Sequence, residues 1–114
     1  RASGLVKAAA LVLLLLPLPA QAELQMITAR YLCERGVQVP VAYVNSDGES
    51  VVTLTVDGSQ ISLYQEQSAS GARYGWPSDG SNYVWWSKGD TATLYWKDET
   101  GAETPILSDC KQQQ

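Results

Sequence analysis

The chain has 114 residues, a formal net charge of −4 and no histidine. Without histidine it has neither a Ser-His-Asp triad nor a His-ligated metal, and no glycine-rich phosphate loop occurs. The negative charge disfavours nucleic acid as a partner, because phosphate binding needs a basic patch. We therefore expect no metal and no cofactor, and a protein that acts by binding rather than as an enzyme.

The first 22 residues have the features of a secretory signal peptide. Arg1 and Lys7 give a positive start, residues 8–16 are an unbroken apolar run, and residues 20–22 match the small-x-small cleavage pattern. The run is shorter than the roughly 20 apolar residues of a membrane-spanning helix. We expect residues 1–22 to be removed. Because the chain opens with Arg rather than Met, its true start is left open.

Residues 23–114 are expected to form one soluble domain. They hold six Lys and Arg against twelve Asp and Glu, a net charge of −6. This charge favours a basic partner, since opposite fields speed encounter, although solubility alone would also account for it. Export to an oxidising compartment predicts a disulfide between Cys33 and Cys110. Closing the 76 intervening residues would stabilise the fold by about 4 kcal/mol. A reactive thiol or a metal site is a weaker alternative.

Short segments rich in Val, Ile, Thr, Tyr and Trp recur between turn residues and predict β-strands. In chain order, these strands are expected at residues 37–44, 51–56, 61–65, 83–87, 91–97 and 104–107. Most acidic residues fall in the turns between them, where they are ordinary turn-formers rather than a pair of catalytic carboxylates.

We expect seven or eight antiparallel strands, which a small β-barrel would close without leaving exposed sheet edges. The disulfide would tie the first and last strands together. A sandwich of two sheets is the alternative architecture.

Two segments look unlike plain barrel. Residues 68–74, SASGARY, extend through residues 75–82 as a polar, glycine-rich loop between strands. Residues 83–89, YVWWSKG, form an aromatic strand that ends in a lysine on a tight turn. Ordinary explanations exist for each feature: Ser-Gly turns are common, one tryptophan fills the core, and Lys88 solubilises a hairpin.

Together these motifs carry a resemblance to a known family. Tyr31-Leu32-Cys33, SASGARY, WWSKGDTATL and the final Cys110 resemble the inhibitors of C-type lysozyme of Gram-negative bacteria. That family has membrane-bound lipoprotein members (MliC) and soluble periplasmic members (PliC). The resemblance covers residues 28–111. With a cleavable signal and no lipidation cysteine, the chain resembles the soluble, periplasmic branch, without a membrane anchor. The loop between Tyr74 and Tyr83 is longer than the family pattern.

The resemblance implies an eight-stranded antiparallel barrel whose two motif loops lie side by side and enter the cleft of C-type lysozyme, a basic protein. It assigns to Ser70 and Lys88 the contacts with the enzyme's catalytic carboxylates. Tyr74 is expected to brace its loop, and Arg73 to point toward the rim or an acidic neighbour on its own barrel. The lysozyme-binding residues that we predict are Ser70, Gly71, Arg73, Tyr74, Lys88 and Gly89.

Two other functions remain open at this point. A carbohydrate-binding module that recognises peptidoglycan fragments would use Trp76, Trp85 and Trp86 as stacking platforms. Because Trp85 and Trp86 are adjacent on a strand, they must face opposite sides, so at most one is core. A small-ligand carrier ranks last, because the tryptophans of so small a domain would fill its barrel. The sequence also leaves open whether the chain forms a homodimer.

Overall fold

A computed structural model describes residues 16–17 and 23–114, so the expected signal peptide lies outside the described residues apart from Leu16 and Pro17. Within the described ranges no helix has the length and apolarity that crossing a membrane requires. The described elements are β1 (Gln25–Leu32), the 3-10 turn η1 (Glu34–Gly36), β2 (Gln38–Ser46), β3 (Glu49–Val56), β4 (Ser59–Glu66), β5 (Ala72–Gly75), β6 (Asn82–Lys88), β7 (Thr91–Lys97) and β8 (Glu103–Gln113).

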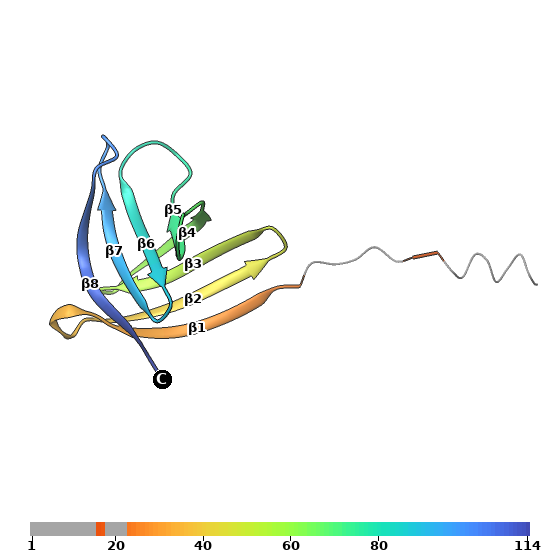
Figure 1. The fold of residues 1–114 in the computed structure, drawn as a ribbon, viewed down its shortest axis with the longest axis horizontal. Helices are drawn as coiled ribbons and strands as arrows, with labels where there is room; N and C mark the ends of the chain where they lie inside the picture. The colour runs from red at the N-terminus through yellow and green to blue at the C-terminus, as the bar shows by residue number, and fades with distance from the viewer. Residues whose placement is uncertain (1–15, 18–22) are drawn as a thin grey trace, which may run out of the picture.

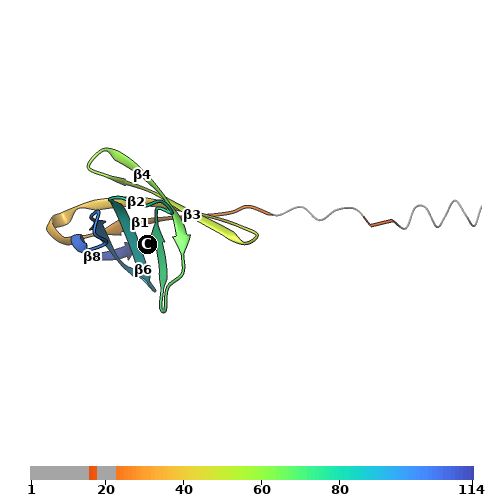
Figure 2. The ribbon, with the colours of Figure 1, turned by 90° about the horizontal axis from the view of Figure 1, so that it is seen from above.

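The eight strands form a closed barrel in which each strand is antiparallel to the next (Figure 1). The seam that closes it pairs Arg30 to Leu32 of β1 with Gln113 to Lys111 of β8. Figure 2 shows the barrel from above, with the hairpin that leads into β4 projecting from it. The predicted all-β barrel is confirmed, and the two-sheet sandwich is not formed.

The barrel interior is filled by the protein's own side chains. Alternate residues of each strand point inward, as the two-residue period of a strand dictates. The largest fully buried side chains of this core are Trp85, Leu54, Leu63, Leu94, Val39, Val52 and Cys110. With this packing, the room that a small-ligand carrier would need is taken by the chain itself.

The aromatic part of the core satisfies its polar groups internally. The indole N–H of Trp85 donates to the hydroxyl of Tyr43 at 3.0 Å, and that hydroxyl is also 2.9 Å from the hydroxyl of Tyr31. The Tyr31 ring meets Trp85 edge-on at 5.2 Å between centroids. Burial raises the pKa of Tyr31 well above its usual range, and the hydrogen bond to Tyr43 adds to this shift.

The predicted disulfide between Cys33 and Cys110 is present and spans 77 positions of sequence. Cys33 follows β1 directly and Cys110 lies in β8, and both are buried. The covalent link therefore joins the two strands at which the barrel closes, and it reinforces a seam held by few backbone pairs.

Two strands were absent from the sequence prediction. β1 has no clear alternation, since six of its eight residues are exposed. β5 lies inside the segment that we expected to be one long loop, and it has four residues. Its strand conformation depends on neighbours at both edges, because it pairs with β4 on one side and β6 on the other. The loop between β5 and β6 is correspondingly shorter, residues 76–81.

Candidate functional site

The SASGARY loop and the β6–β7 hairpin lie against each other. Gly71 has a φ of +66°, and a Cβ added there would come within 3.0 Å of the carbonyl oxygen of Ser87 and 2.6 Å from Cγ of Lys88. Glycine is therefore required at this position for two reasons: its positive φ and the close approach of the neighbouring hairpin. This contact places the two predicted loops side by side.

Pairing between β5 and β6 continues this contact into the sheet. Ala72 pairs with Ser87, Arg73 with Trp86 and Tyr74 with Trp85. Because successive side chains alternate between faces, the Tyr74–Trp85 pair points into the barrel and the Arg73–Trp86 pair points outward.

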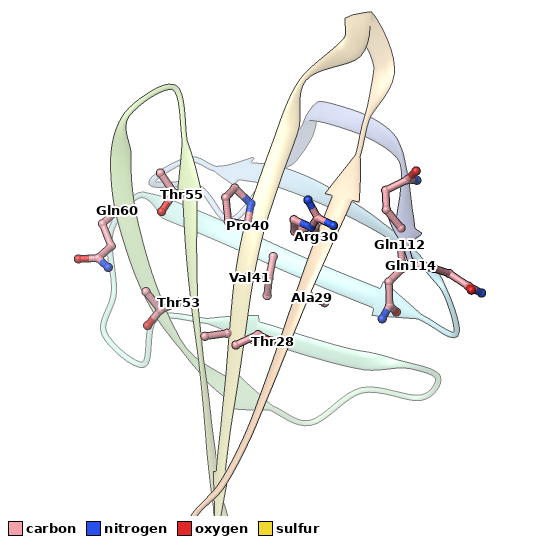
Figure 3. A pocket seen from close by; sticks show the side chains of 12 residues that line it. Thr28, Ala29, Arg30, Pro40, Val41, Thr53, Thr55, Gln60, Gln112 and Gln114 are labelled. Atoms are coloured by element: carbon pink, nitrogen blue, oxygen red, sulfur yellow. The ribbon is translucent and has the colours of Figure 1, made fainter.

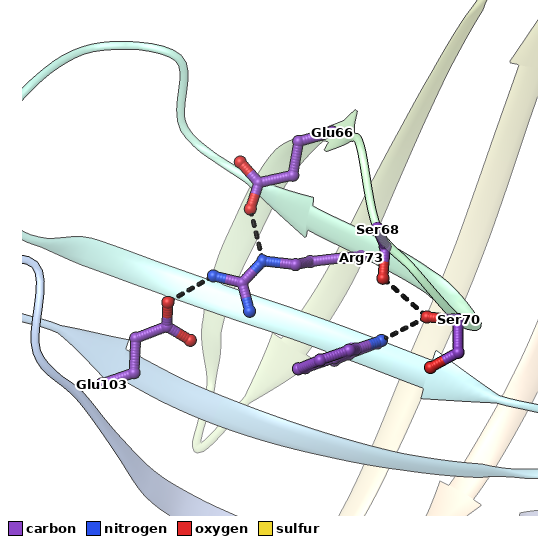
Figure 4. Close-up of polar contacts among 6 residues, drawn as sticks. Glu66, Ser68, Ser70, Arg73 and Glu103 are labelled. Atoms are coloured by element: carbon purple, nitrogen blue, oxygen red, sulfur yellow. Dashed lines mark hydrogen bonds and ion pairs between the residues drawn. The ribbon is translucent and has the colours of Figure 1, made fainter.

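The tip of the first loop is held through one carbonyl oxygen. The hydroxyl of Ser68 donates to the backbone oxygen of Ser70 at 2.6 Å (Figure 4), and the indole N–H of Trp86 donates to the same oxygen at 2.9 Å. Among the described residues the hydroxyl of Ser70 has no hydrogen-bond partner, and the residue is exposed. Its side chain is thus available to an external group.

Lys88 ends β6 and is exposed at the start of the turn through Gly89 and Asp90. Gly89 has a φ of +59°, and Thr91 donates its hydroxyl to the Lys88 carbonyl at 3.0 Å. The ammonium nitrogen lies 4.4 Å from the centroid of the Trp86 ring. Within residues 23–114, Lys88 has no carboxylate partner.

Arg73 is held by acidic side chains of its own barrel, one of the two orientations expected from sequence. Its Nε donates to Glu66 at 2.6 Å, and its Nη2 pairs with Glu103 of β8 (Figure 4). These carboxylates, Glu103 foremost, raise the pKa of Arg73. Gly75 makes room for the pair, since a Cβ there would lie 2.9 Å from Oε2 of Glu66.

Tyr74 is buried at the base of the loop, with its ring centroid 5.6 Å from that of Tyr43. It therefore supports the loop from inside the barrel, while Ser70, Gly71, Lys88 and Gly89 are exposed.

The structure also resolves the orientation of the two adjacent tryptophans. Trp85 is fully buried and cannot serve as a sugar platform, whereas Trp86 lies half-buried on the outer face. Trp76 is 38% exposed, next to the half-exposed Tyr64. Sequence reasoning gave Trp86 a role only as a sugar platform and none in lysozyme binding. Its spacing of two residues from Lys88 was the signal that both share one strand face.

A groove of about 580 Å³ lies elsewhere, on the outer face of β1–β3 beside the C-terminal residues (Figure 3). Its lining is rich in threonine and glutamine, and none of the six predicted lysozyme-binding residues contributes to it. Among the residues described, no group of three His, Cys, Asp or Glu is arranged to hold a metal ion.

Residues 31–103 match the model of the family described as membrane-bound lysozyme-inhibitor of c-type lysozyme. A protein of that name from Pseudomonas aeruginosa is 39% identical over 85 residues, 72% of this chain and 64% of the relative. The relative in Escherichia coli K12 is 36% identical over 90 residues, 79% of this chain and 72% of its own length. The chain thus spans less than two thirds of the Pseudomonas relative. These relatives come from Gram-negative bacteria.

Two solved structures share the fold. Pseudomonas aeruginosa MliC, crystallised in complex with hen egg white lysozyme, superposes with a TM-score of 0.63 at 33% identity, covering 86% of this chain and 92% of that one. PliC of Salmonella typhimurium, a periplasmic lysozyme inhibitor of C-type lysozyme, gives a TM-score of 0.64 at 26% identity. The match covers 79% of this chain and 100% of the PliC chain.

Proposed function

The chain belongs to the family of membrane-bound lysozyme inhibitors of C-type lysozyme, and from this premise we propose that it inhibits C-type lysozyme by inserting two loops into the active-site cleft. The observation that carries the proposal is the packing of Gly71 against Ser87 and Lys88, which presents Ser70 and Lys88 next to each other on exposed loops. The protein would act by binding and not by catalysis.

Lys88 suits the chemistry of the target. Lysozyme works with one glutamic acid kept protonated by an apolar pocket and one aspartate kept ionised. An ammonium group between them is attracted to the aspartate and favours ionisation of the glutamic acid. A glutamate that has lost its proton cannot protonate the leaving oxygen of the glycosidic bond. Lys88 would therefore occupy the site and disable its acid.

Ser70 suits the same pair of carboxyl groups. A hydroxyl both donates and accepts, so it can meet one protonated and one ionised partner. Ala69 and Gly71 keep the tip narrow enough for a groove shaped to hold sugar. Desolvation opposes a buried lysine–carboxylate pair, so most of the affinity would come from the contacts around these two residues.

The location that we propose is the periplasm, reached after removal of residues 1–22. A protein there would meet lysozyme that has crossed the outer membrane. The test is to express the full chain in a Gram-negative host, separate periplasm from membranes and determine the N-terminus of the product. A product that begins near Glu23 in the periplasmic fraction supports the proposal, and one retained in the membrane fraction contradicts it.

The function is tested by titrating residues 23–114 against hen egg white lysozyme lysing a suspension of Gram-positive cells. We expect stoichiometric loss of lysis, and Ser70→Ala is expected to weaken inhibition about tenfold without lowering the melting temperature. Lysis unaffected by a large molar excess of the parent protein would overturn the proposal.

Glycan binding remains the second candidate because Trp76 and Tyr64 expose neighbouring rings, 5.5 Å apart between centroids. Aromatic faces of this kind are available for stacking. Peptidoglycan fragments titrated into the protein without lysozyme decide between the two functions. Saturable binding that Trp76→Leu abolishes would favour the glycan module.

A further inference from the structure

Trp86 lies at the junction of the two loops that we propose to enter lysozyme. It faces outward from β6, directly opposite Arg73 on β5 and two residues before Lys88. It touches both loops with different parts of its side chain. The edge of the ring contacts the SASGARY loop at Ser70, and the face of the ring contacts Lys88 of the β6–β7 hairpin.

The edge of the indole fixes the tip of the first loop. Its N–H donates to the carbonyl oxygen of Ser70 at 2.9 Å, and the hydroxyl of Ser68 donates to the same oxygen. The backbone of Ser70 is thereby anchored while the Ser70 hydroxyl is left for another partner. Phenylalanine at this position would keep an aromatic face and lose the N–H.

The face of the indole restrains Lys88. A lysine side chain is flexible and loses considerable rotamer freedom when it is held in one place. The ammonium of Lys88 lies 4.4 Å from the ring centroid, within the range of a cation–π interaction. Part of the ordering that binding would require is then already present in the free protein.

Arg73 is a second cation near the Trp86 ring, but its charge is already paired within the barrel. The guanidinium carbon of Arg73 lies 5.2 Å from the Trp86 centroid, but Arg73 is paired with Glu66 and Glu103. These carboxylates offset its charge and limit its repulsion of Lys88. Lys88, by contrast, has no carboxylate partner in the described part of the chain and lies on the exposed hairpin.

We propose that Trp86 is a positioning residue for lysozyme binding: one indole holds Ser70 with its N–H and Lys88 with its face, so that both reach the cleft in a fixed relation. This inference rests on the proposed function. It adds that the pair is preorganised in the free protein and that Trp86 acts through Ser70 and Lys88, without itself needing to contact the enzyme.

The first measurement uses the free protein and does not depend on lysozyme. Methylene protons held over an aromatic ring resonate upfield because of the ring current. We expect upfield-shifted side-chain protons of Lys88 in the parent, a reduced shift in Trp86→Phe and none in Trp86→Leu. Random-coil shifts for Lys88 in the parent would overturn the inference, whatever the inhibition assay gives.

The second measurement compares inhibition constants. We expect Trp86→Leu to inhibit about tenfold more weakly and Trp86→Phe severalfold more weakly, while Trp76→Leu, a similar loss at the other end of β5, matches the parent. Melting temperatures control for folding, and Trp86→Phe keeps the test usable should Trp86→Leu not fold. Unchanged inhibition by Trp86→Phe and a folded Trp86→Leu would overturn the inference and leave the proposed function intact.

A double-mutant cycle identifies the route of action. If Trp86 acts through Lys88, Trp86→Leu should weaken inhibition clearly less in a Lys88→Ala background than in the parent. Equal losses in both backgrounds would mean that Trp86 does not act through Lys88, and would overturn the inference that one indole positions both residues. A parent that does not inhibit at all overturns the proposed function, and this inference with it.

Discussion

Two of the tight hairpins of the barrel have turns of the same length and different surroundings. β3 and β4 are joined through Asp57-Gly58, and β6 and β7 through Gly89-Asp90, each a two-residue turn that needs positive φ. At the β3–β4 turn, a methyl group added to Gly58 would meet nothing within 4 Å. The β6–β7 hairpin is packed beside its turn, at Ser87 and Lys88, against Gly71 of another loop.

The difference lies in the neighbours of the turn and not in the turn itself. Two-residue turns of this kind are set by local sequence. What distinguishes the β6–β7 hairpin is the second loop and the indole beside it, which restrict where Lys88 can point. A candidate binding hairpin is thus recognised by the residues that pack beside its turn.

The largest effect should come from removing the ammonium beside the turn of the β6–β7 hairpin. Lys88→Ala is expected to weaken inhibition ten- to hundredfold, about 1.4–2.7 kcal/mol, because the catalytic carboxylates lose their cation. Lys97→Ala, on the next strand, should match the parent in the same assay. Comparable losses for both lysines would mean that overall charge, and not the hairpin, carries the binding.

A pair of glycine substitutions compares the loop that packs against the β6–β7 hairpin with the turn of the β3–β4 hairpin. Gly71→Ala and Gly58→Ala share the strain of positive φ, which should cost about 1 kcal/mol in the free energy of unfolding. Gly71→Ala also forces a methyl group against Ser87 and Lys88, so it alone should weaken inhibition, by about tenfold. Chemical denaturation and the lysis assay measure the two effects. Equal inhibition by both variants would remove the distinction between the hairpins.

High pH should affect the barrel rather than either hairpin. Burial raises the pKa of Tyr31 and of Tyr74, so their contribution to stability is complete below pH 10, near the pKa of an unfolded tyrosine, and declines as pH rises above it. Above pH 10, each pH unit should lower the free energy of unfolding by up to about 1.4 kcal/mol per tyrosine. Melting temperatures from pH 8 to 11.5 measure this. A curve that stays flat above pH 10 would contradict the assigned burial.

The smallest effect should come from charge at the distant hairpin. Residues 23–114 carry a net charge of −6, so association with a basic enzyme should be faster at low salt. Asp57→Asn removes one charge while keeping a residue tolerant of positive φ. The association rate should fall less than twofold at low salt and not at all at high salt. A loss that persists at high salt would indicate direct contact.

Sequence patterns predicted most of the barrel because its longer strands have alternating apolar residues and recognisable turns at their ends. Residues 91–97 alternate cleanly, and the Asp57-Gly58 turn has the dipeptide that such hairpins favour. β5 escaped prediction because four residues carry no detectable period, and its strand form is imposed by β4 and β6.

The candidate site was predictable only in part. Motif resemblance located Ser70 and Lys88, and the structure places their loops together. The contacts of Trp86 could not be foreseen, because adjacent tryptophans are equivalent until their partners on β5 are known. Trp85 pairs with the buried Tyr74 and Trp86 with the half-buried Arg73, and that register decides which ring faces outward.

The ion pair between Arg73 and Glu103 has a consequence for transplantation. Both loops and the indole between them fall within residues 66–93, a contiguous stretch that could be grafted onto another barrel as one cassette. Glu103 lies outside that stretch, on β8. A recipient scaffold would have to offer a carboxylate from a strand beyond the graft, or the transplanted arginine would face the indole with half of its counter-charge missing.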